Sequence, residues 1–148
     1  MNDTLAAVLQ KGVPVFDGLF DLLEDLEAAN IATAVASNGP MAKMQASLRP
    51  SGLWERFDGR IYSGHVFAPK PAPDMLLAAC EAAGVAPRHT VMVGDTSYDM
   101  DMARNAGCLA LGVSWGYHDA ARLSAAHLMV DDIRLLPGLL DQIWRQMT

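Results

Sequence analysis

The sequence predicts a three-layer α/β fold, a Rossmann-like and mostly parallel sheet with helices on both faces. Short apolar runs alternate along the chain with amphipathic helical patterns. These runs are almost continuously apolar, which is typical of parallel strands buried on both faces, and each ends in a turn of small or polar residues. The 148 residues, 51% of them hydrophobic, provide the core of one domain.

The first half of the chain shows one helix, one strand and a second helix. Leucines recur at helical spacing with acidic residues between them, which predicts an amphipathic helix over residues 18–29. The apolar run at 31–36 predicts a buried strand that stops at the turn 37–40, and a helix follows over 41–48.

The second half repeats this alternation. A strand is predicted at 60–62, a proline-rich loop at 68–73 and a helix over 74–83 that Gly84 ends. Next come a strand at 90–93, a helix that ends at Gly107, a strand over 108–113 and a final helix over 136–147. Because ligands bind beyond the carboxyl ends of such strands, polar residues at those ends are the candidate site.

Charge and composition exclude several classes of partner. Seventeen acidic residues against eleven basic ones give a net charge of -6, which disfavours broad contact with nucleic acid or an anionic membrane. Cys80 and Cys108 form no Cys-x-x-Cys pattern, so neither a disulfide framework nor a zinc site is indicated. With no leader-like start and no long apolar run, we expect a cytoplasmic protein.

Ser37 and Asn38 follow the first of these strands, directly before Gly39 and Pro40. Small polar residues before a proline are ordinary helix-start chemistry. The same hydroxyl and turn amides could also face a phosphoryl oxygen, since helix N-termini attract anions. Both interpretations can hold together.

Lys70 lies between Pro69 and Pro71, so its backbone is biased toward extended conformations. Most single lysines are solvated surface charges. A lysine held on a stiff loop near carboxylates would instead offset the charge of a bound phosphate.

The strongest pattern is Gly94-Asp95-Thr96-Ser97-Tyr98-Asp99 after the strand at 90–93. Helix capping alone would explain these residues, with Asp95 or Thr96 as the cap and Asp99 at the positive end of the helix. However, Asp95 and Asp99 lie one helical turn apart, and two carboxylates within ~4 Å would repel by about 4 kcal/mol at an effective dielectric near 20. A divalent cation or Lys70 would remove that cost, and oxygen ligands suit Mg2+ better than zinc.

Together, these three clusters resemble the haloacid dehalogenase-like superfamily, close to its phosphoglycolate phosphatase and β-phosphoglucomutase branches. Residues 34–38 resemble the family's second motif, Lys70 in Lys-Pro-Ala-Pro-Asp its third, and residues 93–99 its fourth. The resemblance implies that Ser37 and Asn38 contact the transferring phosphoryl group, that Lys70 steadies its charge and that Asp95 ligates Mg2+. It implies that Asp99 either ligates the metal through water or orients Lys70.

The N-terminal part of the chain departs from the family. The first motif, Asp-x-Asp-Gly, supplies the nucleophile and the general acid/base; it does not occur here, and Phe16-Asp17-Gly18 matches it only superficially. We therefore expect a single core domain over residues 1–148, with 1–17 a remnant of cap or linker and the first strand missing. Because the family places that strand between the second and the fourth, its loss would expose two apolar edges and favour a partner strand or homo-oligomer.

Three functions remain open on this sequence. The first is a magnesium-dependent phosphatase of small phosphorylated metabolites that, in its complete form, acts through an aspartyl-phosphate. The second is a catalytically inactive module that binds phosphate and magnesium or regulates another protein. The third is an enzyme in which Asp17 serves as an unorthodox nucleophile. Whether this chain is an enzyme depends on the nucleophilic aspartate of the first motif, which is missing from the sequence.

Overall fold

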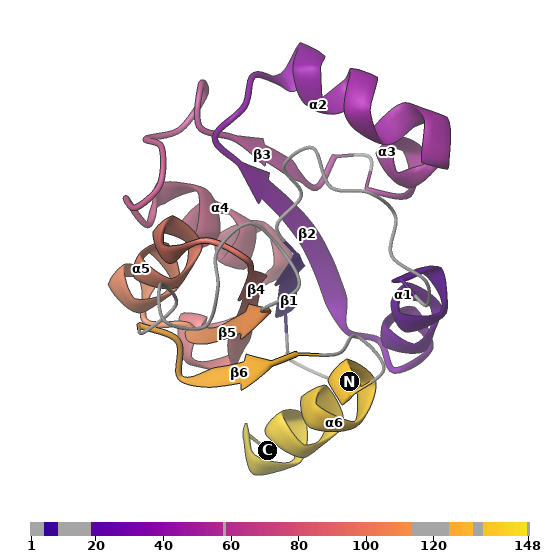
Figure 1. Ribbon diagram of the computed structural model, residues 1–148, viewed down its shortest axis with the longest axis vertical. Coiled ribbons are helices and arrows are strands. Elements are labelled where there is room, and N and C mark those ends of the chain that lie inside the picture. Colours follow the sequence, from indigo (N-terminus) through magenta and orange to yellow (C-terminus); the bar gives the residue numbers. More distant parts are fainter. Residues whose placement is uncertain (1–4, 9–18, 58, 114–124, 132–134, 148) are drawn as a thin grey trace.

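The computed structural model describes residues 5–8, 19–57, 59–113, 125–131 and 135–147, and these form one six-stranded sheet (Figure 1). All five strand pairs are parallel, in the order β3-β2-β1-β4-β5-β6. The strands are β1 (Leu5–Val8), β2 (Ala32–Ser37), β3 (Ile61–Ser63), β4 (Thr90–Gly94), β5 (Leu109–Val113) and β6 (Leu128–Val130).

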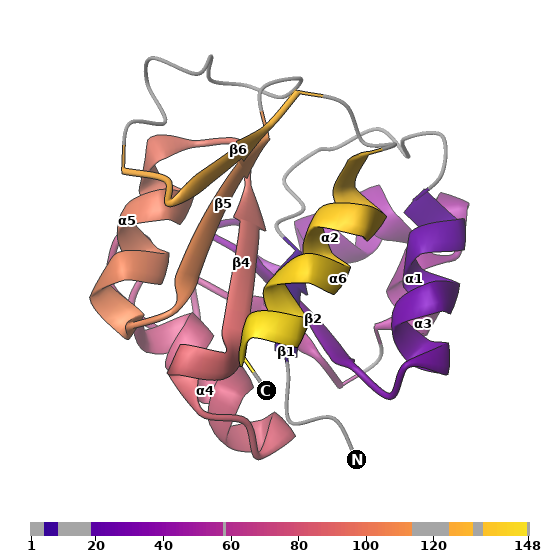
Figure 2. The same cartoon turned by 90° about the horizontal axis from the view of Figure 1, so that it is seen from below.

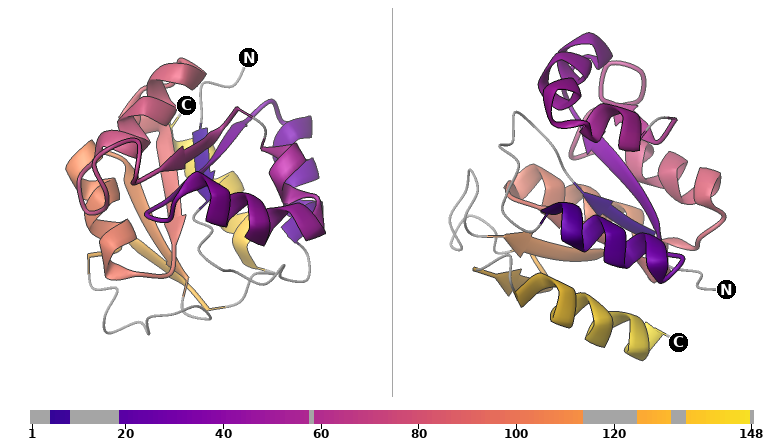
Figure 3. Two further views of the ribbon diagram at one scale, coloured as in Figure 1. Left: turned by 90° about the horizontal axis from the view of Figure 1, so that it is seen from above. Right: turned by 90° about the vertical axis from the view of Figure 1, so that its right-hand side faces the viewer.

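Helices cover both faces of the sheet, which confirms the three-layer prediction (Figures 2 and 3). The α-helices are α1 (Leu19–Ala28), α2 (Met41–Leu48), α3 (Leu53–Arg56), α4 (Asp74–Ala83), α5 (Ser97–Ala106) and α6 (Leu136–Met147). Two short 3-10 helices are η1 (Arg49–Ser51) and η2 (Pro87–His89). One layer holds α4 and α5, while α1 and α6 pack on the opposite face, with α2 and α3 beside α1.

Side chains that alternate along β4 divide the core between these layers. Met92 of β4 packs with residues of α4 and α5, whereas its neighbours Val91 and Val93 pack with α1 and α6. All three are at most 7% exposed. Burial on both faces is why the strands read as continuous apolar runs in the sequence.

The predicted helices and their ends agree closely with the structure. The helices predicted over 41–48, 74–83 and 136–147 coincide with α2, α4 and α6. Gly84 and Gly107 end α4 and α5 with φ of 69° and 79°, left-handed values that glycine adopts without a Cβ clash. The short elements β6 and α3 were not predicted.

The expectation of a missing first strand is wrong for this structure. Leu5–Val8 forms β1, which pairs with β2 on one side and with β4 on the other. The four residues satisfy backbone groups that two apolar strand edges would otherwise leave unpaired. The sheet therefore has no central gap, and self-association through such a gap loses its basis. Residues 9–17 of the proposed cap or linker remnant lie outside the described residues.

Within the described parts of the chain, no helix combines the length and the apolar character that crossing a membrane requires.

Candidate functional site

The candidate site lies where β2 and β4 end, at the carboxyl edge of the sheet. Ser37 is the last residue of β2, and Asp95 directly follows the last residue of β4. Only β1 separates these two strands, and neighbouring strands lie about 4.8 Å apart, so the two positions are roughly 10 Å apart across the edge. A phosphoryl group and a hydrated cation fit across that span.

The turn after β2 places a buried hydroxyl at this edge. Ser37 is 1% exposed, and its Oγ accepts a hydrogen bond from the amide of Gly39 at 3.2 Å. Within the residues that the structure describes, the proton of this hydroxyl has no protein acceptor, so it can be donated to an anion. Helix α2 begins at Met41, so the turn does precede a helix, but the N-cap is Pro40 and no side chain caps the helix. The helix-start interpretation is therefore only partly confirmed.

Lys70 connects this turn to the aspartates. Its amide donates to Oδ1 of Asn38 at 2.7 Å, and its Nζ lies 2.6 Å from Oδ1 of Asp99. The lysine is 8% exposed, unlike the solvated surface lysine that was its alternative interpretation. Lys70 lies between two prolines, and its peptide bond to Pro71 is cis.

Asp99 is fully buried, and both of its carboxylate oxygens are engaged. Oδ2 accepts from the amide of Thr96 at 3.1 Å and from its hydroxyl at 2.8 Å, while the Thr96 hydroxyl accepts from the Asp99 amide. Oδ1 meets Lys70 as an ion pair rather than as a well-aligned hydrogen bond. This reciprocal cap of α5 confirms the capping interpretation. Of the two roles implied for Asp99, the geometry favours orienting Lys70 over ligating a metal.

Gly94, at the end of β4, packs directly against the Asp99 side chain. A Cβ added to Gly94 would lie 2.4 Å from the Cβ of Asp99 and 2.7 Å from its Oδ2. Real Cβ atoms do not approach that closely, so only glycine allows β4 to end against α5 in this way.

Asp95 is the other predicted metal ligand. Its carboxylate is not part of the buried ion pair between Lys70 and Asp99. It is partly exposed and has contacts of its own. Among the described residues, no group of three or more His, Cys, Asp or Glu side chains gathers into a metal site. One carboxylate still fits Mg2+, which keeps several waters and is commonly completed by substrate phosphate oxygens. The residues present thus fit a cation that Asp95 holds together with a phosphate.

The loop after β3 contributes contacts that the sequence patterns did not reveal. The hydroxyl of Ser63 donates to the carbonyl of Gly39 at 2.7 Å, and the amide of Gly64 donates to the carbonyl of Ser37 at 2.8 Å. No periodicity or motif marked these residues; the only signal was their place at the end of a predicted strand beside the second motif.

Two features lie at the amino ends of the strands, away from this edge. Cys80 and Cys108 are free and buried, and a hydrogen bond from the Cys108 thiol lowers the pKa of Cys80 to about 7. The same contact, together with burial, raises the pKa of Cys108. The structure therefore brings together two thiols that the sequence separates, as unoxidised core residues.

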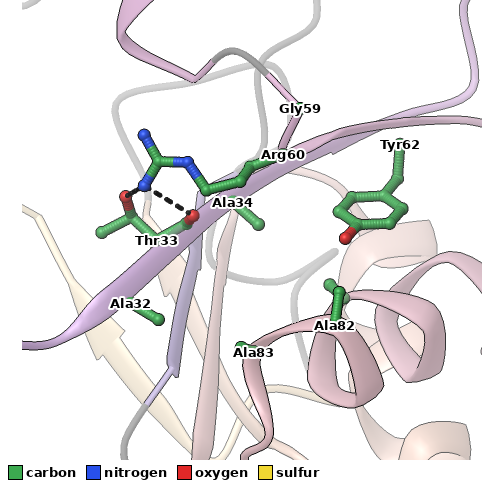
Figure 4. A pocket seen from close by; sticks show the side chains of 9 residues that line it. Ala32, Thr33, Ala34, Gly59, Arg60, Tyr62, Ala82 and Ala83 are labelled. Atoms are coloured by element: carbon green, nitrogen blue, oxygen red, sulfur yellow. Dashed lines mark hydrogen bonds between the residues drawn. The ribbon is translucent and has the colours of Figure 1, made fainter.

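A cavity of about 220 Å3 opens between the first residues of β2 and β3 and the last turn of α4 (Figure 4). Alanines line most of its wall, and Arg60 lies across β2, where it donates to Oγ1 and the carbonyl of Thr33. This cavity is at the opposite end of β2 from Ser37 and shares no lining residue with the candidate site.

Fold and site together define a three-layer α/β domain whose polar residues gather at the carboxyl edge of a parallel sheet. Residues 1–113 match the family described as haloacid dehalogenase-like hydrolase. The chain belongs to this family, in its phosphoglycolate phosphatase-like branch.

Three relatives illustrate the similarity. The probable phosphatase IndB of Dickeya dadantii (strain 3937) is 40% identical over 116 residues, 78% of this chain and 50% of that protein. The phosphoglycolate phosphatase of Escherichia coli (strain K12) is 31% identical over 135 residues, covering 89% and 54%. The crystal structure of a HAD family hydrolase from Deinococcus radiodurans R1 with bound phosphate and sodium superposes with a TM-score of 0.78, 26% identity, and coverage of 86% and 59%.

The chain spans about half the length of the curated relatives it matches. The candidate nucleophile Asp17 lies outside the described residues, so the structure does not place it at the site.

Proposed function

We propose that this chain carries the phosphate- and magnesium-binding part of a phosphatase site, and that in its complete form the protein hydrolyses small phosphorylated metabolites through an aspartyl-phosphate. One observation carries this proposal: an unbroken series of contacts runs from Asn38 through Lys70 to Asp99 along the carboxyl edge between β2 and β4. An ion pair that only stabilised the fold would not need to be hydrogen-bonded, through Asn38, to the turn at the carboxyl edge of the sheet. Parallel sheets bind their ligands at that edge.

The proposal gives each residue a role, and for Ser37 and Lys70 the contacts described above support that role. The Ser37 hydroxyl donates to a phosphoryl oxygen, and the amides of the following turn add further donors. Lys70, held by Asp99, contributes a fixed positive charge beside the phosphate. Asp95 holds Mg2+, which when bound would offset the charge that builds up on the phosphoryl oxygens.

The substrate class follows from the relatives. Those named phosphoglycolate phosphatase and N-acetylmuramic acid 6-phosphate phosphatase indicate small phosphorylated acids and sugars. The residues to which this proposal gives a role would all act on the phosphoryl group, so residues elsewhere would select among these substrates.

A second function is favoured by the central strand itself. The described strand β1, Leu5–Val8, lies between β2 and β4, where the family keeps the strand that carries its nucleophile. In the sequence, neither these four residues nor the next four, Leu-Gln-Lys-Gly, include a carboxylate. On that basis, the chain as given would bind phosphate and magnesium without turnover, as a binding or regulatory module.

The test measures two properties of the purified chain: magnesium-dependent release of phosphate from p-nitrophenyl phosphate, and binding of inorganic phosphate by calorimetry with and without Mg2+. Asp95→Asn removes the proposed metal ligand. Asp101→Asn is the matched control, because Asp101 is an exposed carboxylate further along α5.

Turnover that disappears in Asp95→Asn but not in Asp101→Asn would support the phosphatase and locate a nucleophile within these 148 residues, with Asp17 the first to replace. Magnesium-dependent phosphate binding without turnover, lost in Asp95→Asn, would support the binding module. A folded chain that neither turns over the ester nor binds phosphate would refute both.

A further inference from the structure

The turn that holds Ser37 is attached to the end of β3 at two points. Ser63 is 1% exposed, and its Oγ donates to the carbonyl of Gly39 at 2.7 Å while accepting from the amide of His65 at 3.1 Å. One residue on, the amide of Gly64 donates to the carbonyl of Ser37 at 2.8 Å. Both carbonyls that flank Asn38 are therefore fixed by the same short segment.

That segment also lies in close contact with Asn38. A Cβ on Gly64 would come within 2.9 Å of both Cα and Oδ1 of Asn38, and within 3.2 Å of the Cβ of Pro69. The Oδ1 atom is the acceptor for the Lys70 amide. The end of β3 thus packs against Asn38, whose side chain connects the serine turn to the lysine loop.

We propose that Ser63 is a positioning residue for phosphate binding: it holds the Ser37–Gly39 turn in the orientation in which its hydroxyl and amides, and Lys70 through Asn38, face a common point. The proposal rests on the proposed function and adds a determinant that no motif of the sequence contains. Ser63 is not itself placed to touch the phosphate, because its hydroxyl proton is already donated to Gly39.

The physical reason is the cost of ordering the donors. Without the Ser63 hydroxyl, the partly buried Gly39 carbonyl loses its donor and the turn can rotate away from it. Phosphate then binds only after the turn is ordered again, so part of the binding free energy is spent on that step. A net contribution of about 0.5–1.5 kcal/mol per hydrogen bond corresponds to roughly two- to tenfold weaker binding.

The experiment compares two variants that each remove one buried hydroxyl bonded to a backbone carbonyl. Ser63→Ala removes the bond at the carboxyl edge. Thr90→Val is the matched control at the amino end of β4, where the fully buried Thr90 hydroxyl donates to the Ala86 carbonyl at 3.0 Å. Both should lower the melting temperature by similar amounts.

The measured quantities are the dissociation constant of inorganic phosphate in Mg2+ by calorimetry and the hydrogen exchange of the Gly39 and Lys70 amides by NMR. We expect two- to tenfold weaker phosphate binding and faster exchange of both amides in Ser63→Ala, with neither change in Thr90→Val. Ser63→Thr, which retains the hydroxyl, should restore most of the affinity. Gly64→Ala, which displaces Asn38 directly, should weaken binding as well.

Ser63→Ala with wild-type phosphate affinity, or a loss matched by Thr90→Val, would overturn the proposal. If the wild-type chain binds no phosphate, the proposed function fails, and amide exchange alone decides the positioning role. Faster exchange confined to Ser63→Ala would then still support it, and unchanged exchange would overturn it.

Discussion

The buried ion pair between Lys70 and Asp99 should make the contributions of these two residues to the free energy of unfolding depend on each other. The atoms Nζ and Oδ1 are 2.6 Å apart, and the two side chains are 4% and 0% exposed. At an effective dielectric near 20, unit charges at that separation attract by about 6 kcal/mol, much of which offsets the desolvation of both groups.

Removing one charge takes away the counter-ion that the other, buried group has in this pair. Lys70→Met and Asp99→Asn should therefore each lower the free energy of unfolding by about 3–5 kcal/mol. For a chain of this size, that corresponds to a fall in melting temperature of roughly 6–20 °C. The double variant should cost at least about 2 kcal/mol less than the sum of the two, because neither charge is then left alone.

Urea unfolding followed by circular dichroism provides these free energies for the complete double-mutant cycle. The matched control is the exposed pair Arg145–Asp141, 2.9 Å apart at i,i+4 on α6, where the same substitutions should couple by only about 0.3–0.5 kcal/mol. A coupling energy for the buried pair no larger than that of the surface pair would refute the reasoning.

Three further outcomes are expected. Gly94→Ala places a Cβ 2.4 Å from the Cβ of Asp99, so it should lower the free energy of unfolding in urea by about 1–3 kcal/mol. Gly138→Ala, with open space around it, should not lower that free energy. Equal effects of the two substitutions would contradict the crowding at Gly94. Cys108→Ala removes the hydrogen bond that lowers the pKa of Cys80 to about 7, so the ultraviolet absorbance of the thiolate should titrate at higher pH; an unchanged midpoint would show that the two thiols do not interact. Burial, and secondarily a nearby arginine, lowers the pKa of His127 below 6.5, so the folded state binds fewer protons than the unfolded chain just below that pH, and the free energy of unfolding should fall as the pH drops from about 7.5 to about 5.5. His127→Gln should flatten that slope, and an equally steep slope in the variant would assign it to other groups.

The helices and the longer strands could be predicted because their signals are local. The predicted ranges for α2, α4 and α6 match, since leucine spacing, terminal glycines and prolines act within one or two helical turns. The four residues of β1 had no such signal: leucine, alanine and valine over four positions suit a helix as well as a strand, and only the two neighbouring strands decide.

The candidate site divides in the same way. The sequence placed Ser37, Lys70 and Asp99 at strand ends, and the structure links them through Asn38 and a buried ion pair. The sequence could not predict the contact of Ser63, whose hydroxyl donates to the carbonyl of Gly39, 24 positions away. Contacts of that kind depend on the packing of two elements, which no local pattern records.

The position of β1 sets the order in which the sheet can form. It pairs with β2 across 27 positions of the chain, but Leu5 reaches its partner in β4 only at Thr90, 85 positions away. The β3-β2 half and the β4-β5-β6 half each close through nearer neighbours, and within the described sheet β1 is the strand that joins the two. Non-local parallel pairing is slow. During synthesis at about 5–20 residues per second, roughly 4–17 s therefore pass between the emergence of Leu5 and that of Thr90, its partner in β4.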